Sequence, residues 1–158
     1  MKKIELLSPA GNLASLKAAV VNGADAVYLG LDKFSARQYA KNFDKDYLKQ
    51  AVQICKSNNV KLYLAMNTLV KNDELNEFFN NLNYTYEQGI DSVIIQDISL
   101  IDIIKKSFPG LKIHISTQAG IMNSLQLQLL SGADRITLAR EMSQKEIAYL
   151  KLKTDKEI

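Results

Sequence analysis

The sequence has little of several residue types: its 158 residues include one cysteine, one histidine, two prolines and no tryptophan. The lone cysteine, Cys55, excludes an internal disulfide, which is typical of proteins in a reducing cytosol. One cysteine and one histidine are too few to build a zinc or iron–sulfur site, so we expect no metal site and no cofactor within this chain. We therefore expect a cytoplasmic protein.

Long hydrophobic runs are also missing. No apolar stretch approaches the roughly 20 residues that cross a bilayer, and the short one near the start is interrupted by Glu5, which excludes a signal peptide and a membrane partner. The net charge is only +3, with the lysines scattered, so composition gives no case for nucleic-acid binding. A hydrophobic content of 47% predicts one domain, residues 1–158, with a real core.

What the sequence does contain is a cassette that occurs three times. Each copy ends a helix with glycine, turns at aspartate and enters an apolar run: NGADAVYLG at 22–30, QGIDSVIIQ at 88–96 and SGADRITLA at 131–139. Glycine suits the left-handed position that closes a helix, and aspartate suits the turn that follows. The cassette therefore predicts a junction from a helix to a strand in a parallel sheet.

Six units, each a strand followed by a helix, can be traced along the chain. We expect strands at 4–7, 26–29, 60–66, 92–95, 111–115 and 135–138. Helices are expected at 12–21, after a cap at Asp44, around 75–86 and 101–108, near 123–130, and after a capping box at 143–146. Because strands and helices alternate strictly, the sheet is predicted to be parallel. Cys55 lies on the apolar stripe of the second helix, so we expect a buried core residue.

The polarity of the strands favours one of two architectures. The fifth strand alternates apolar and polar residues, LKIHIS at 111–116. Strands of an open doubly wound sheet are apolar on both faces, whereas a barrel lets one face meet the helices and the other face the lumen. We therefore predict an α/β fold, an incomplete TIM-like (β/α) barrel of about six parallel units, with the open doubly wound parallel sheet as the alternative.

A closed barrel of this kind has eight units, so we expect the chain to be the amino-terminal fragment of a longer barrel protein. Its first and sixth strands would then be open edges with unpaired backbone groups. We expect self-association through these edges, or a terminal segment that covers one of them. Little catalytic activity is expected of the chain alone.

The active site of such a fold lies in the loops at the carboxyl ends of the strands. Polar residues in these loops are the candidates for substrate binding: Ser35, Arg37, Asn67, Gln96, Gln118 and Arg140. A guanidinium there can clamp a carboxylate or a phosphate with two hydrogen bonds. The alternative for each arginine is a salt bridge to Asp97 or Glu141 across the mouth of the barrel.

No motif selects a catalytic set, and the catalytic residues stay open at this point. His114 and Ser116 project from one face of the fifth strand, and Asp97 or Glu141 can approach from neighbouring strands, which allows a nucleophile, a base and an orienting group. The alternative is that His114 is hydrogen-bonded in a polar layer of the lumen.

Three stretches resemble a known family. They are ELLSPAGN at 5–12 with GADAVYLG at 23–30, FSAR at 34–37 with NF at 42–43, and QD at 96–97 with HISTQ at 114–118 and ARE at 139–141. In this order, and over essentially the whole chain, they resemble the amino-terminal part of peptidase family U32, the collagenase-like proteases of bacteria. The resemblance implies a TIM-like catalytic domain, a cytoplasmic bacterial protein and hydrolysis of peptide bonds.

The same resemblance implies a competing function. Several relatives in that family are hydroxylation factors for transfer RNA, ribosomal RNA or ubiquinone, some with an iron–sulfur cluster held by four cysteines. The family's signature, with its cysteines, follows the sixth unit, so a cluster would belong to a downstream part of a longer protein.

We therefore expect a peptidase whose peptide or protein substrate lies across the strand-end face, oriented by Arg37 or Arg140, with His114 as the general base. The first alternative is a hydroxylation factor that holds RNA or a quinone ring on the same face. The second is a non-catalytic module that binds a partner.

Overall fold

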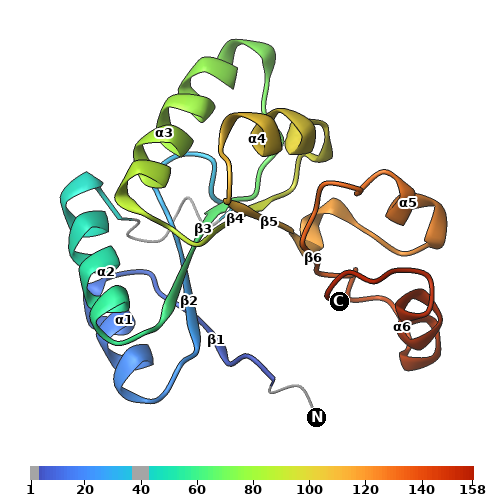
Figure 1. The fold of residues 1–158 in the computed structure, drawn as a ribbon, viewed down its shortest axis with the longest axis horizontal. Helices are drawn as coiled ribbons and strands as arrows, with labels where there is room; N and C mark the ends of the chain where they lie inside the picture. The colour runs from blue at the N-terminus through green and yellow to red at the C-terminus, as the bar shows by residue number, and fades with distance from the viewer. Residues whose placement is uncertain (1–3, 37–42) are drawn as a thin grey trace.

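The computed structural model describes residues 4–36 and 43–158, which form an arc of six parallel strands with helices outside it (Figure 1). The strands are β1 (Leu7–Pro9), β2 (Ala26–Gly30), β3 (Lys61–Met66), β4 (Ser92–Ile95), β5 (Lys112–Ile115) and β6 (Arg135–Ile136). The helices are α1 (Leu13–Val21), α2 (Lys45–Ser57), α3 (Leu75–Gln88), α4 (Ile101–Ser107), α5 (Ser124–Gln128) and α6 (Gln144–Lys151). Three short 3-10 turns, η1 (Asn72–Glu74), η2 (Ile98–Leu100) and η3 (Thr117–Ala119), follow β3, β4 and β5.

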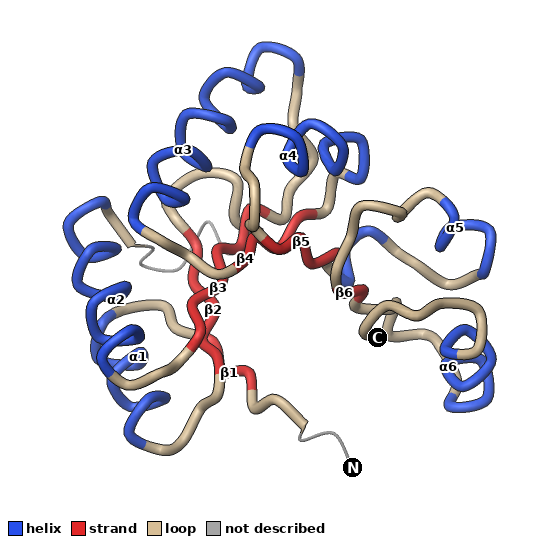
Figure 2. Tube along the Cα trace, in the orientation of Figure 1, coloured by secondary structure: helices blue, strands red, loops and turns tan. Residues whose placement is uncertain are grey.

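The strands are ordered β1-β2-β3-β4-β5-β6, and every neighbouring pair is parallel. The sheet curves, and the six helices lie on its outer, convex side (Figure 2). A doubly wound sheet needs helices on both faces, so the alternative architecture is not the one that forms. The predicted incomplete (β/α) barrel is confirmed.

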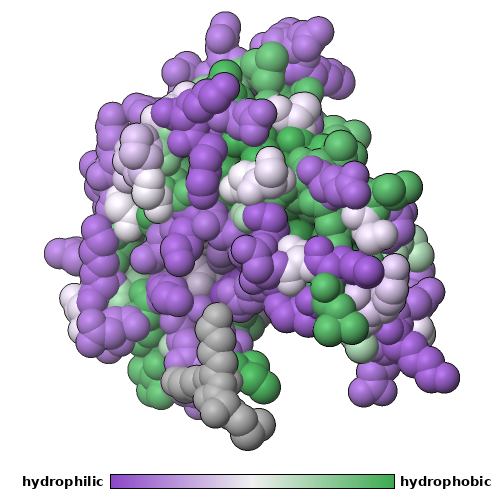
Figure 3. Space-filling model, turned by 45° about the vertical axis from the view of Figure 1, so that its right-hand side comes forward, coloured by the Kyte–Doolittle hydropathy of each residue, from purple (hydrophilic) through white to green (hydrophobic). Residues whose placement is uncertain are grey.

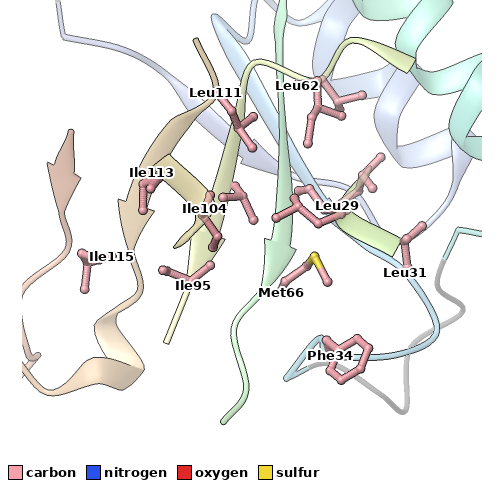
Figure 4. Packing of buried hydrophobic residues seen from close by; sticks show 14 of the residues in the cluster. Leu29, Leu31, Phe34, Leu62, Met66, Ile95, Ile104, Leu111, Ile113 and Ile115 are labelled. Atoms are coloured by element: carbon pink, nitrogen blue, oxygen red, sulfur yellow. The ribbon is translucent and has the colours of Figure 1, made fainter. Parts of the chain in front are cut away.

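The core lies between the outer face of the sheet and the helices. Leu29, Met66, Ile95 and Ile113 come from four successive strands, and each is at most 1% exposed. Figure 4 shows them in one layer with Ile104 of α4. Because side chains alternate along a strand, the residues between them face the lumen, and these include polar groups such as His114 beside apolar ones such as Ile94.

Helix starts follow the predicted capping chemistry. Asn12 accepts a hydrogen bond from the backbone N–H of Ser15, and Asp44 caps α2 through Asp46 and Tyr47. The predicted capping box at the start of α6 forms, with Ser143 and Glu146 bonded reciprocally. These caps fix where the helices begin and therefore how long each strand-end loop is.

The aspartate of each cassette does more than turn the chain. Its carboxylate accepts the backbone N–H of a residue at the start of the preceding strand, and its own N–H donates to the carbonyl of that same residue. The pairs are Asp25 with Leu6, Asp91 with Leu62 and Asp134 with Ile113, with the carboxylate bonds at 2.9, 2.8 and 2.9 Å. These three aspartate clamps join β1 to β2, β3 to β4 and β5 to β6.

Removing one aspartate clamp is expected to weaken the whole sheet. Asp91→Ala leaves the N–H of Leu62 without its charged acceptor, and hydrogen bonds to charged groups are worth about 1.5–3 kcal/mol. We expect the free energy of unfolding, measured in urea, to fall by about 2 kcal/mol. Asp91→Asn keeps an acceptor oxygen and should lose less, while Asp32→Ala, at an exposed loop residue, should lose almost nothing. Equal stability of the Ala variant and the parent would contradict the clamp.

The expected burial of Cys55 is confirmed. Its thiol is 1% exposed, and burial raises its pKa to about 11. We expect Cys55→Ala to cost on the order of 1 kcal/mol of stability, as small cavity-forming changes do. The native protein should react with a thiol reagent only as fast as it unfolds, and rapid labelling would contradict this placement.

The two edges of the sheet differ. At the β6 edge Glu157 forms a parallel bridge with Arg135, and its carbonyl accepts the N–H of Ile136 at 2.8 Å. At the β1 edge the side chains of Ile4 and Leu6 are 89% and 53% exposed. Figure 3 shows green hydrophobic patches beside largely purple, hydrophilic surface.

We propose that the chain self-associates through the β1 edge, because exposed apolar residues next to unpaired backbone groups favour pairing. Sedimentation of a dilution series should reveal larger species at high concentration. Leu6→Lys should shift the series toward the monomer, whereas Leu152→Lys, on the outer helix layer and 84% exposed in the parent, should not. A monomer at every concentration would refute the proposal.

Candidate functional site

A groove of about 430 Å³ lies at the carboxyl ends of the strands and is called the carboxyl-end groove here. Its lining residues come from all six strands or the loops after them: Leu7, Tyr28, Ala36, Ala65, Asn67, Ile94, Ser116, Thr117, Gln118, Thr137 and Arg140. Four of the predicted site residues are thus brought together, namely Asn67, Ser116, Gln118 and Arg140.

Hydrogen bonds between neighbouring loops hold the groove in shape. Asn67 directly follows β3, and its side-chain oxygen accepts the N–H of Ala36 at 3.1 Å, which ties the loop after β2 to the end of β3. Gln96 follows β4 and donates from Nε2 to the carbonyl of Gln118 at 3.3 Å. Gln96 therefore supports the rim of the groove although it is not among the lining residues.

Two of the predicted binding residues come from the loop after β2. Ser35 is only 3% exposed, beside Ala36 at the wall of the groove. Arg37 lies outside the described residues.

Two of the side chains considered for catalysis, Ser116 and Asp97, cap short 3-10 turns. The hydroxyl of Ser116 accepts the N–H of Gln118 at 3.2 Å. The carboxylate of Asp97 accepts the N–H and hydroxyl of Ser99 at 3.1 and 2.6 Å. Glu141 is exposed and does not line the groove. Among the described residues none of the three is hydrogen-bonded to His114, so the nucleophile, base and orienting group are not assembled.

His114 lies instead in a polar cluster at the amino-terminal end of the lumen, as the alternative interpretation proposed. Its Nδ1 is 3.3 Å from the hydroxyl of Ser92, and its ring meets Tyr63 edge-on at 4.7 Å between centroids. The histidine is 5% exposed. Burial, helped by the positive charge of Arg135, lowers the pKa of His114 to about 4, so the ring is neutral at physiological pH.

The centre of this cluster is Glu5, which precedes β1 and which the sequence did not single out. Its carboxylate is 2.7 Å from the guanidinium of Arg135, 130 residues away on β6. Tyr63 donates to both carboxylate oxygens at 2.9 Å, and Lys61 lies 3.0 Å away. Burial raises the pKa of Glu5, but hydrogen bonds from Arg135, Lys61 and Tyr63 outweigh it and bring the pKa to about 2. Arg135 also pairs with Glu157 at 3.0 Å.

The two ends of the lumen differ in charge. The residues Glu5, Lys61, Tyr63, Ser92, His114 and Arg135 are called the amino-end cluster here. A second cavity, of about 640 Å³, opens beside it. This cavity is lined by charges of both signs: Lys61, Lys112, Arg135 and Lys156 against Asp91, Asp134, Asp155 and Glu157. In the carboxyl-end groove Arg140 is the one charged side chain among the described lining residues. The described lining of the groove therefore carries one positive charge and no negative one.

The described residues do not fit an iron–sulfur cluster. The chain's one thiol, Cys55, is buried in the core and held protonated by its raised pKa. No group of three or more histidine, cysteine or acidic side chains within the described ranges is placed to hold a metal ion. In the same ranges no helix combines the length and the apolar character needed to cross a membrane.

Several known proteins are similar in sequence to this chain over almost its whole length. An uncharacterized protease of Methanocaldococcus jannaschii is 36% identical over 159 residues, covering 99% of this chain and 39% of that protein. The tRNA hydroxylation protein P1 of Bacillus subtilis is 35% identical, covering 99% of this chain and 38% of that protein. The chain thus spans about two-fifths of the length of these relatives.

A solved structure shares the fold. The structure of a U32 peptidase superimposes with a TM-score of 0.79 at 14% identity and covers 98% of this chain and 66% of that one. The model of the family described as "Peptidase family U32" matches residues 11–158. This chain therefore belongs to peptidase family U32.

Proposed function

We propose that this chain is the substrate-binding part of an RNA-hydroxylation protein and that its carboxyl-end groove holds a nucleobase. The observation that carries the proposal is the chemistry of the groove. Its described lining has amides, hydroxyls, an aromatic ring and one guanidinium, but no carboxylate, imidazole or thiol. The name of the B. subtilis relative, a tRNA hydroxylation protein, supports the same function.

Each of these groups suits an unpaired base. Single-stranded RNA is recognised by stacking on aromatic rings and by hydrogen bonds to the exposed base edges. Tyr28, half-buried on β2, offers a ring at one wall, and Ile94 and Ala65 provide apolar surface beside it. The amides of Asn67 and Gln118 supply donors and acceptors for a base edge.

The groove lacks a group that can transfer protons at neutral pH among its described lining residues. We therefore propose that this chain binds and orients the base, while the oxidising chemistry comes from outside it. Because Cys55 does not fit as a cluster ligand, we derive no chemical step through such a group.

Binding of a short fluorescent single-stranded RNA to the 158-residue chain tests the proposal by fluorescence anisotropy. Stacking of a base on an aromatic side chain is worth about 1–3 kcal/mol by alanine substitution, so Tyr28→Ala should weaken binding by about tenfold. Tyr28→Phe keeps the ring and should bind like the parent. RNA binding that is absent in the parent, or equal in both variants, would refute the proposal.

Peptide-bond hydrolysis is the second candidate, favoured by the name of the M. jannaschii relative. It requires a base, and His114 is the chain's one imidazole. Incubation of the chain with an unstructured peptide distinguishes the two functions. Cleavage that disappears in His114→Gln would establish the peptidase and displace the RNA proposal. RNA binding without cleavage favours hydroxylation.

A further inference from the structure

Arg140 differs from Arg135, the other described arginine, in having no partner among the described residues. Arg135 is bonded to Glu5 and Glu157, at 2.7 and 3.0 Å. Arg140 is exposed at the groove and makes no ion pair or hydrogen bond with the described residues, including the two carboxylates considered for it, Asp97 and Glu141. The expected alternative, a salt bridge across the barrel mouth, does not form within these residues. Within the described part of the chain, the exposed guanidinium of Arg140 is thus unpaired beside the groove.

The position of Arg140 separates it from the surface suited to a base. Tyr28 lies on β2 and Arg140 follows β6, and these two strands are separated by β3, β4 and β5 in the sheet. Thr137 lines the groove in the same segment after β6 as Arg140. Its hydroxyl is a group that commonly contacts phosphate and sugar oxygens in protein–nucleic-acid complexes, whereas the hydroxyl of Thr117 already donates to the carbonyl of Leu138. The β2 part of the groove therefore offers stacking, and the segment after β6 offers a positive charge with one hydroxyl.

We infer that Arg140 binds a backbone phosphate of the RNA strand whose base occupies the groove, an assignment that rests on the proposed function. A planar guanidinium matches two phosphate oxygens with parallel hydrogen bonds, and its charge does not depend on pH in the physiological range. Contacts of this kind fix the register of the strand and carry no base sequence information. Arg140 is thus a positioning residue for the strand.

The salt dependence of RNA binding tests this assignment. Each phosphate contact on a single strand contributes about 0.7 to the slope of log K against log salt concentration. Arg140→Gln should reduce the slope by about that amount and weaken binding at low salt by about tenfold. Arg140→Lys keeps the charge but loses the paired geometry, so it should retain the slope with intermediate affinity.

Lys106→Gln is the matched control, because Lys106 is an exposed cation on α4 in the outer helix layer. It should change neither slope nor affinity, and thermal unfolding of each variant checks that it folds. Arg140→Gln with the parent's slope and affinity would overturn the phosphate assignment while leaving the proposed function standing. A parent that does not bind RNA would refute the proposed function itself. Binding of an acidic peptide through Arg140, with no RNA binding, would assign this residue to a carboxylate instead.

Discussion

Arg135→Leu is expected to destabilise the protein by about 3 kcal/mol, the lower end of the cost of breaking a buried ion pair. The substitution leaves the Glu5 carboxylate, 16% exposed, facing the ring of Tyr63 without its 2.7 Å partner. It also removes the bond to Glu157 that holds the end of the chain beside β6. Urea unfolding followed by circular dichroism gives the change in the free energy of unfolding.

The control for this experiment is Lys105→Met. Lys105 pairs with Asp134 at 3.0 Å, but 46% of its side chain is exposed, and exposed pairs contribute less than about 1 kcal/mol. The double variant that also replaces Glu5 by leucine removes both buried charges and should recover part of the loss. A stability of Arg135→Leu equal to that of Lys105→Met would mean that the cluster does not hold the two ends of the sheet together.

Acid is expected to lower the free energy of unfolding over two successive pH ranges, the first of which is due to His114. The folded pKa of His114 is about 4, below its ordinary value of 6.5, so the folded state favours the neutral ring. The stability from this preference is fully present above pH 6.5 and is lost as the pH falls from 6.5 to 4. At 1.36 kcal/mol per pKa unit, the loss is about 3 kcal/mol.

Glu5 adds the second stage at lower pH. Its folded pKa of about 2 lies below its ordinary value of 4.5, so its contribution is present above pH 4.5 and is lost as the pH falls from 4.5 to 2. Unfolding free energies measured from pH 8 to pH 3 in His114→Gln should lack the upper stage and keep the start of the lower one. A variant that retains the decline between pH 6.5 and pH 4.5 would show that other groups cause it.

The strands and helices could be predicted because their signals are local. The cassette marks the start of β2, β4 and β6, and the alternation in β5 correctly separated the helix-facing side from the lumen. The ends of the strands were predicted less accurately. The first strand spans Leu7–Pro9 instead of residues 4–7, and just before it the N–H of Leu6 bonds to the carboxylate of Asp25 instead of a ladder carbonyl. The sixth strand ends at Ile136, two residues early, where the carbonyl of Leu138 accepts the hydroxyl of Thr117.

The candidate site was harder to predict. A sequence pattern shows which face of the sheet a side chain is on, but not at which end of the lumen it lies. His114 and Ser116 do share a face, but two residues along a strand correspond to about 6.6 Å. That step places Ser116 at the carboxyl-end groove and His114 in the amino-end cluster. The bond between Glu5 and Arg135 joins residues 130 apart and has no local signal at all. The loop positions of Asn67 and Arg140, by contrast, follow directly from where their strands end.

The aspartate clamps determine where the chain can be divided without separating the two residues of a clamp. Each clamp lies within one pair of strands, whereas successive pairs are joined by the ordinary ladder and by side-chain bonds such as that of Asn67 with Ala36 and that of Gln96 with Gln118. A chain divided after β2 or β4 keeps every clamp whole, whereas a division after β3 separates Leu62 from Asp91. The strand pair is therefore the smallest module that can be duplicated, exchanged or deleted with its aspartate clamp intact. A chimera joined at such a boundary should inherit complete modules from both parents.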